Sequence, residues 1–206
     1  FSGIEVWVGT SYGDQMIGNN SANTLDGGAR NDRLQGGGGD DILLPGSGAN
    51  TLDGGSGMDI VSYANIFTFG GIGIELRVTP FAAKFGEISD DTFTSIEGII
   101  GTSADDRLEM DNNANYIDGG AGNDVLTGFG GIDTIYGGAG VDNINSGTEA
   151  DFVYGGDGDD LINGWAGNDT IYGDAGNDRI DGSTGVDQMY GGAGNDTYLV
   201  DDASDG

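Results

Sequence analysis

A nine-residue period runs through most of this chain and restricts what it can fold into. Residues 119–127 read GGAGNDVLT, and the same register holds without a break from Gly101 to Leu199 and again from Gly9 to Ser62. A short fixed period means that each unit contacts mainly its neighbours. The sequence therefore predicts a solenoid of stacked turns.

Two positions of the unit carry most of its chemistry. The sixth position is occupied by Asp14, Asn23, Asp32, Asp41, Asn50, Asp59, Asp106, Asn115, Asp124, Asp133, Asp142, Asp151, Asp160, Asp169, Asp178, Asp187 and Asp196. The eighth position of the units in 101–199 is occupied by Leu108, Ile117, Leu126, Ile135, Ile144, Val153, Ile162, Ile171, Ile180, Met189 and Tyr198. The residues after the Asp form a short strand whose middle side chain points inward, because side chains alternate along a strand. One inward side chain per unit makes a core too narrow to hold the chain folded alone.

The charge of the chain requires a neutralising partner. Asp and Glu number 35 against 6 Lys and Arg, which gives a formal net charge of −29. A charge this high with few apolar residues is typical of disorder. A fold is possible if a metal ion neutralises the carboxylates, and the 44 glycines let the backbone approach such an ion closely.

Composition also excludes several classes of site. The chain has no Cys and no His, which removes thiolate and histidine metal sites and the catalytic triads. Nucleic acid is disfavoured as a partner because phosphate binding needs Lys and Arg. No apolar run reaches the roughly 20 residues of a transmembrane segment. Paired carboxylates such as Asp159 and Asp160 are turn residues in register, so we expect no enzymatic activity.

The units resemble GGxGxDxUx, the motif of the RTX (repeats-in-toxin, hemolysin-type) calcium-binding family. Similar regions occur in serralysin-type proteases, alginate epimerases and large secreted RTX proteins. The resemblance implies an all-β fold, a right-handed parallel β-roll (RTX solenoid) with two units in each 18-residue turn. It also implies that Ca²⁺ lies between one turn and the turn two units later.

The resemblance implies a ligand set for each ion. Each ion would be bound by two units that lie two apart. The first unit would supply its carbonyls at positions two and four and its Asp. The second unit would supply its carbonyls at positions one and three and its Asp. The implied metal ligands are Asp32, Asp41, Asp59, Gly37, Gly39, Gly54, Gly120, Gly122, Asp124, Asp133, Gly137, Ala139, Gly138, Gly140, Asp142, Asp151, Gly155, Asp157, Gly156, Gly158, Asp160, Gly167, Asp169, Gly173, Gly176, Asp178, Asp187, Gly191, Gly194 and Asp196. One ion for each pair of units two apart gives a ceiling of about 13 Ca²⁺ ions.

Several units depart from the motif. Arg30 and Glu149 replace a glycine at position four, and Pro45 and Ser146 replace a first glycine. Units 9–17, 18–26, 101–109 and 110–118 lack most turn glycines, and we expect weak or absent ions there.

A second, 18-residue spacing appears in the tyrosines. Tyr136, Tyr154, Tyr172 and Tyr190 stand at the ninth position of every other unit, and the alternate units carry Thr127, Asn145, Asn163 and Asp181. One sheet is therefore expected to be aromatic on its outer surface and the other polar. The tyrosines form either a stabilising cross-strand stack or a surface for glycan stacking or self-association.

Residues 63–100 break the register. Residues 72–78 alternate like a strand, and we expect a β-hairpin that turns near Pro80 and packs on the end of a roll. The sequence then divides into a first roll block with its leading strand (1–62), a β-hairpin or small-sheet insert (63–100), and a second roll block with an exit strand (101–206). The run 93–103, FTSIEGIIGTS, resembles the run 1–11, FSGIEVWVGTS, which predicts a larger hairpin-plus-roll repeat.

These features predict a calcium-binding module of a large secreted bacterial protein. It would fold on Ca²⁺ outside the cell or at its surface after type I secretion. The alternatives are a structural subunit of an extracellular filament, surface layer or adhesin, and an accessory module of an extracellular protease or epimerase. Beyond calcium, the partners considered are further copies of the chain, neighbouring repeat domains, and an extracellular polysaccharide or surface.

Overall fold

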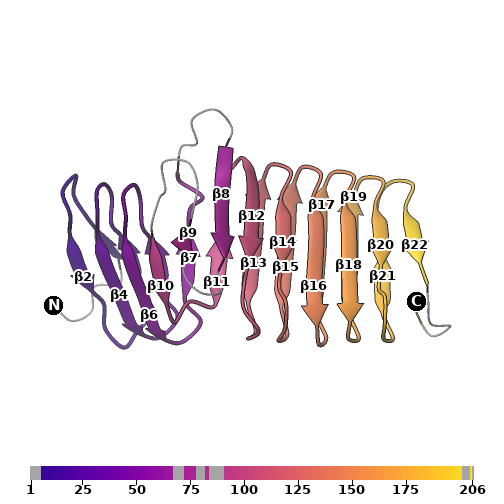
Figure 1. The fold of residues 1–206 in the computed structure, drawn as a ribbon, viewed down its shortest axis with the longest axis horizontal. Helices are drawn as coiled ribbons and strands as arrows, with labels where there is room; N and C mark the ends of the chain where they lie inside the picture. The colour runs from indigo at the N-terminus through magenta and orange to yellow at the C-terminus, as the bar shows by residue number, and fades with distance from the viewer. Residues whose placement is uncertain (1–5, 67–71, 78–81, 84–90, 201–204, 206) are drawn as a thin grey trace.

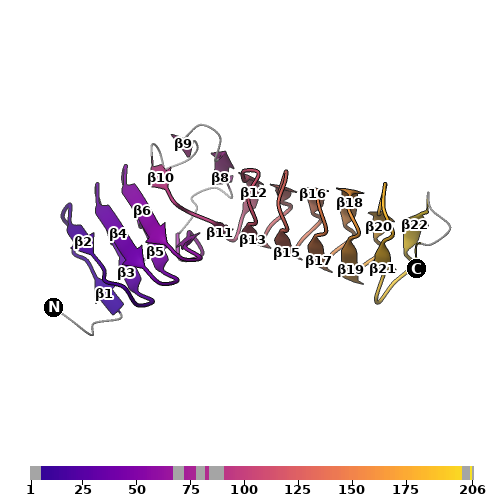
Figure 2. The same ribbon diagram turned by 90° about the horizontal axis from the view of Figure 1, so that it is seen from below.

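The computed structural model describes residues 6–66, 72–77, 82–83, 91–200 and 205. Across these ranges the chain is all β and winds into a parallel solenoid of about ten turns, consistent with a right-handed β-roll (Figure 1). Figure 2 shows that successive strands alternate between two facing rows. The solenoid predicted from the nine-residue period and the all-β parallel roll implied by the resemblance are both confirmed.

One row is a single ten-stranded sheet, here called the long sheet. It contains β1 (Val6–Val8), β3 (Thr24–Asp26), β5 (Ile42–Leu44), β7 (Ile60–Ser62), β11 (Gly98–Ile100), β13 (Tyr116–Ala121), β15 (Thr134–Ala139), β17 (Phe152–Asp157), β19 (Thr170–Ala175) and β21 (Gln188–Tyr190). Neighbouring strands pair in parallel, with residues 18 apart opposite one another in both blocks, such as Ile135 and Val153.

The other row is divided into two shorter sheets. The first short sheet contains β2 (Gln15–Ile17), β4 (Arg33–Gly38), β6 (Thr51–Ser56) and β10 (Thr92–Thr94). The second short sheet contains β8 (Ile72–Arg77), β9 (Ala82–Ala83), β12 (Asp105–Glu109), β14 (Val125–Thr127), β16 (Asn143–Thr148), β18 (Leu161–Ala166), β20 (Arg179–Asp181) and β22 (Thr197–Leu199).

The core is a line of side chains between the two rows. The eighth-position residues from Leu108 to Ile180 are fully buried, and Met189 is nearly so. Tyr198 differs from the expected inward position: it is 44% exposed, and its hydroxyl accepts a hydrogen bond from the Gly191 N–H at 2.6 Å. Among the residues described, no apolar helix of membrane-spanning length occurs.

The insert interrupts one row of strands and leaves the other continuous. β8 pairs in parallel with β12 and antiparallel with β9, so the expected hairpin extends the second short sheet at its edge. β10 pairs with β6 and extends the first short sheet, while β11 joins β7 to β13 within the long sheet. The turn expected near Pro80 lies outside the described residues. The two blocks therefore share one sheet.

Candidate metal centre

The sixth-position residues form two ladders along the sides of the solenoid. One ladder lies in the turns that lead from the long sheet to a short sheet, here called outward turns. The other lies in the turns that lead back, here called return turns. The main-chain N–H of Asp142 donates to Oδ1 of Asp160, 18 residues later, at 2.8 Å, and Asp133 donates to Asp151 in the same way. Repetition of this bond fixes the rotamer of each Asp.

The second carboxylate oxygen of most of these aspartates is buried and has no partner among the residues that the structure describes. The side chain is almost fully buried, and its Oδ2 accepts no hydrogen bond from the described ranges of the chain, in Asp32, Asp41, Asp59, Asp124, Asp133, Asp142, Asp151, Asp160, Asp169 and Asp178. A buried anionic oxygen without a partner costs free energy unless a cation or a proton satisfies it. Desolvation accordingly raises the pKa of Asp133 to about 8 and that of Asp160 to about 7.

The first glycine of each turn leaves space in front of this oxygen. A Cβ placed on Gly155 would lie 2.5 Å from Oδ2 of Asp160 and 2.7 Å from the carbonyl oxygen of Gly173. Gly119, Gly137 and Gly173 have the same surroundings: the Oδ2 of the Asp in the same unit and the carbonyl oxygen of the residue 18 positions later. Two oxygens therefore converge at a point that only glycine leaves open.

All the glycines expected as ligands at positions two and four adopt positive φ. They are Gly37, Gly39, Gly120, Gly122, Gly138, Gly140, Gly156, Gly158, Gly167, Gly176 and Gly194. A Cβ on Gly138 or Gly140 would overlap the carbonyl oxygen of the glycine 18 residues earlier, because the turns stack closely. Ala139 and Asp157, expected as carbonyl ligands, lie opposite each other at the ends of β15 and β17. The expected first-position ligands Gly54 and Gly191 likewise face Oδ2 of Asp59 and Asp196.

The ligand chemistry fits calcium. Within the part of the chain that the structure describes, no three acidic side chains gather at one point, so carbonyl oxygens must supply most ligands. Ca²⁺ takes six to eight hard oxygen ligands, including backbone carbonyls, in flexible geometry. When bound, the ion supplies the positive charge that offsets the buried carboxylates. The residues present therefore fit calcium.

Departures from the motif do not interrupt the stack. Arg30 and Glu149 at position four, and Phe129 and Trp165 at position two, adopt φ between 71° and 78°, in the left-handed region that glycine occupies elsewhere. This conformation costs an L-residue about 1–2 kcal/mol, which the neighbouring turns must offset. The unit 146–154 thus keeps its turn despite Ser146 and Glu149.

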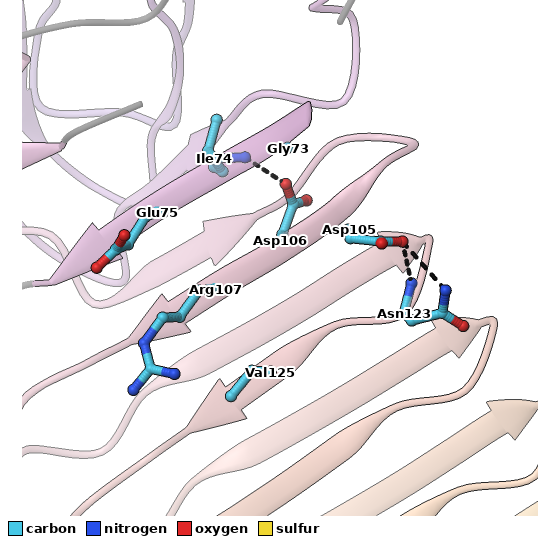
Figure 3. A pocket seen from close by; sticks show the side chains of 8 residues that line it. All are labelled: Gly73, Ile74, Glu75, Asp105, Asp106, Arg107, Asn123 and Val125. Atoms are coloured by element: carbon cyan, nitrogen blue, oxygen red, sulfur yellow. Dashed lines mark hydrogen bonds between the residues drawn. The ribbon is translucent and has the colours of Figure 1, made fainter. Parts of the chain in front are cut away.

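Some sixth-position residues are satisfied by the protein itself. Oδ2 of Asp14 accepts the Thr10 N–H at 2.7 Å, and Oδ2 of Asp106 accepts the Thr102 N–H at 2.6 Å. Figure 3 shows Oδ1 of Asp106 accepting the Ile74 N–H from β8, at 2.5 Å. Because these carboxylates belong to units 9–17 and 101–109, the bonds give a physical reason for the weak or absent ions expected there.

Two residues at the insert were missed by the sequence analysis. Oδ1 of Asp91 accepts the Asn50 N–H at 2.6 Å, and Oε2 of Glu97 accepts the Asp59 N–H at 3.0 Å. Both therefore stand in the ladders as sixth-position residues. Each precedes a short strand with a buried apolar residue in the middle, Phe93 or Ile99, and this acid-plus-strand pattern was the available signal.

The four tyrosines stack on the outer face of the long sheet. Tyr136, Tyr154, Tyr172 and Tyr190 have neighbouring ring centroids 4.8, 5.1 and 4.9 Å apart, with planes within 12° of parallel. Each interior ring is covered on both faces, so the stack presents ring edges outward. This geometry favours cross-strand stabilisation over stacking against a glycan.

Comparison with known proteins agrees with this chemistry. A search of curated proteins gave no significant match. The family profile described as RTX calcium-binding nonapeptide repeat matches residues 17–52, 46–63, 100–135, 111–144, 136–171 and 166–198, well over half of the chain. With its buried aspartate ladders and glycine turns, the chain belongs to the RTX calcium-binding repeat family.

Proposed function

We propose that the chain is a calcium-folding module of a larger secreted bacterial protein. It leaves the cell unfolded, by type I secretion, and folds outside the cell or at its surface as it binds Ca²⁺. The observation that carries the proposal is the ladder of almost fully buried aspartates whose Oδ2 atoms have no partner in the part of the chain that the structure describes. Without a cation these charges repel one another in a chain of net charge −29. Site formation and folding are then one equilibrium.

A calcium titration followed by far-ultraviolet circular dichroism tests the coupling. The chain starts in excess chelator and should show little strand signal, then gain it cooperatively. Extracellular calcium modules bind at about 10⁻⁴–10⁻³ M, so the midpoint is expected in that range. A chain that is already fully folded in excess chelator refutes the proposal, and Mg²⁺ at equal concentration serves as the control because it demands a tight octahedron.

A structural role in a surface layer, adhesin or filament is a second candidate. It is favoured by the tyrosine stack along the long sheet, whose last ring, Tyr190, is 46% exposed. Sedimentation velocity with and without Ca²⁺ separates the candidates. A folded chain that stays monomeric in calcium at high protein concentration contradicts the structural role and leaves the folding module standing.

A further inference from the structure

On the return-turn side, Glu97 follows Asp59 in the ladder of the first block. The Asp59 N–H donates to Oε2 of Glu97 at 3.0 Å, just as the Asp41 N–H donates to Oδ1 of Asp59 at 2.8 Å. The Gly98 N–H donates to the Asp59 carbonyl at 2.9 Å, as the Ile60 N–H donates to the Asp41 carbonyl. Glu97 therefore takes the place of a sixth-position Asp although it lies outside the nine-residue register.

The Ser95 carbonyl takes the place of a first-position carbonyl in the same turn. A Cβ built on Gly54 would lie 2.6 Å from Oδ2 of Asp59 and would overlap the Ser95 carbonyl oxygen, which is the arrangement found around Gly155. Ser95 adopts a φ of 52°, a conformation that an L-residue holds only when its surroundings require it. Only one residue separates Ser95 from Glu97, and the longer Glu side chain compensates for the shorter turn.

The oxygen that faces this turn is buried and unsatisfied. Asp59 has no exposed surface, and none of the described residues donates a hydrogen bond to its Oδ2. A hollow lined by Ser95, Glu97 and Asp111 lies beside the turn. A cation between these oxygens would remove the cost of burying the Asp59 charge.

We propose that Asp59, the Ser95 carbonyl and Glu97 form a divalent-cation site, most suited to Ca²⁺, that joins the two blocks. The inference rests on the proposed function, because it assigns one more site to the same calcium-dependent fold. The ion would link β7 to β11 at the one place where the long sheet crosses the insert. The motif does not include this site.

The outward-turn side of the insert is built differently. There, Oδ2 of Asp91 accepts a hydrogen bond from the Tyr63 hydroxyl at 2.7 Å, and Tyr63 is fully buried. Asp106 is satisfied by Thr102 and Ile74 (Figure 3). On the outward-turn side, protein hydrogen bonds therefore satisfy the acidic side chains at the insert. On the return-turn side, the Asp59 oxygen remains unsatisfied. In the similar run 1–11, Glu5 stands at the place of Glu97.

Ion counting by native mass spectrometry of the full chain at saturating Ca²⁺ tests the site. Glu97→Gln keeps a carbonyl oxygen for the Asp59 N–H and removes only the charge, so it should hold one ion fewer than the wild type. Glu149→Gln makes the same change on an exposed return-turn side chain and should hold the wild-type number. Equal ion counts in the wild type and Glu97→Gln overturn the proposal.

Crystals of the wild-type chain grown in Ca²⁺ supply a measurement that does not depend on the variant folding. An anomalous-difference peak between Asp59 and Glu97 supports the site. Peaks at the motif turns with none at this position overturn it and leave the proposed function intact. A wild-type chain that binds no calcium at any turn refutes the proposed function itself.

Discussion

Asp159 and Asp160 are neighbours in one turn and differ only in where their carboxylates point. Asp160 is 2% exposed, and its Oδ2 lies unsatisfied near the Gly173 carbonyl. Asp159 is exposed, and its Oδ1 accepts two hydrogen bonds from Asn177 at 2.7 and 2.9 Å. The same substitution, Asp→Asn, should therefore weaken calcium binding at Asp160 and leave it unchanged at Asp159.

Asp160→Asn keeps the oxygen that accepts the Asp142 N–H and removes the charge that faces the ion. At 10 mM Ca²⁺, a site with a Kd of about 10⁻⁴–10⁻³ M stabilises the fold by about 1.4–2.7 kcal/mol. Loss of one ion should lower the free energy of unfolding by that amount. With a typical urea m-value near 2 kcal/mol/M, the unfolding midpoint falls by about 1 M.

Urea unfolding at 10 mM Ca²⁺, followed by circular dichroism, measures the difference between the variants. Asp159→Asn should leave the midpoint unchanged. In excess chelator, where the chain is largely unfolded, Asp160→Asn should show more residual strand signal than Asp159→Asn, because it removes a charge whose burial nothing offsets. Equal midpoints for the two variants in calcium would show that the buried carboxylate does not hold an ion, and the reasoning would fail.

Three further predictions follow from the same geometry. Gly140→Ala should lower the free energy of unfolding in calcium by several kcal/mol and raise the Ca²⁺ concentration at the folding midpoint. The added methyl group would overlap the Gly122 carbonyl, and the φ of 140° is unfavourable for alanine. An unchanged calcium titration would contradict this prediction. Ile144→Ala should lower the free energy of unfolding in calcium, measured by urea unfolding, by about 2–5 kcal/mol. The reason is that Ile144 is fully buried in a core one residue wide. A loss below about 1 kcal/mol would contradict this prediction. In chelator, acidification from pH 8 to pH 5 should increase the strand signal. Burial raises the pKa of Asp133 to about 8 and that of Asp160 to about 7, so the folded chain binds protons that the unfolded chain, in which the Asp pKa is near 3.8, does not bind. A constant circular dichroism signal over this range would refute the prediction.

The regular turns could be predicted from the sequence because their environment repeats. Asp124 and Asp142 stand at the same position of the unit, so each meets the same neighbours 18 residues before and after. The same logic placed Ile144 in the core and Tyr154 on the outer face of the long sheet. Where the repeat holds, knowing one turn amounts to knowing the others.

The insert could not be read in this way, because its length is not a multiple of the repeat. The residue that follows Asn50 in the ladder is Asp91, and the one that follows Asp59 is Glu97, so sequence spacing does not identify either partner. Only the folded chain shows which oxygens meet. It also shows that the Tyr63 hydroxyl satisfies Asp91 and that no residue in the described part of the chain satisfies Oδ2 of Asp59.

The sequence by itself determined the solenoid, its inward side chains and its aspartate turns, because a nine-residue period imposes one local geometry on every unit. Only the tertiary structure decided that the two blocks share one sheet and that Glu97 follows Asp59 in the ladder. The physical reason is that hydrogen bonds and burial depend on distances in space, and outside the repeat those distances no longer follow from separation along the chain.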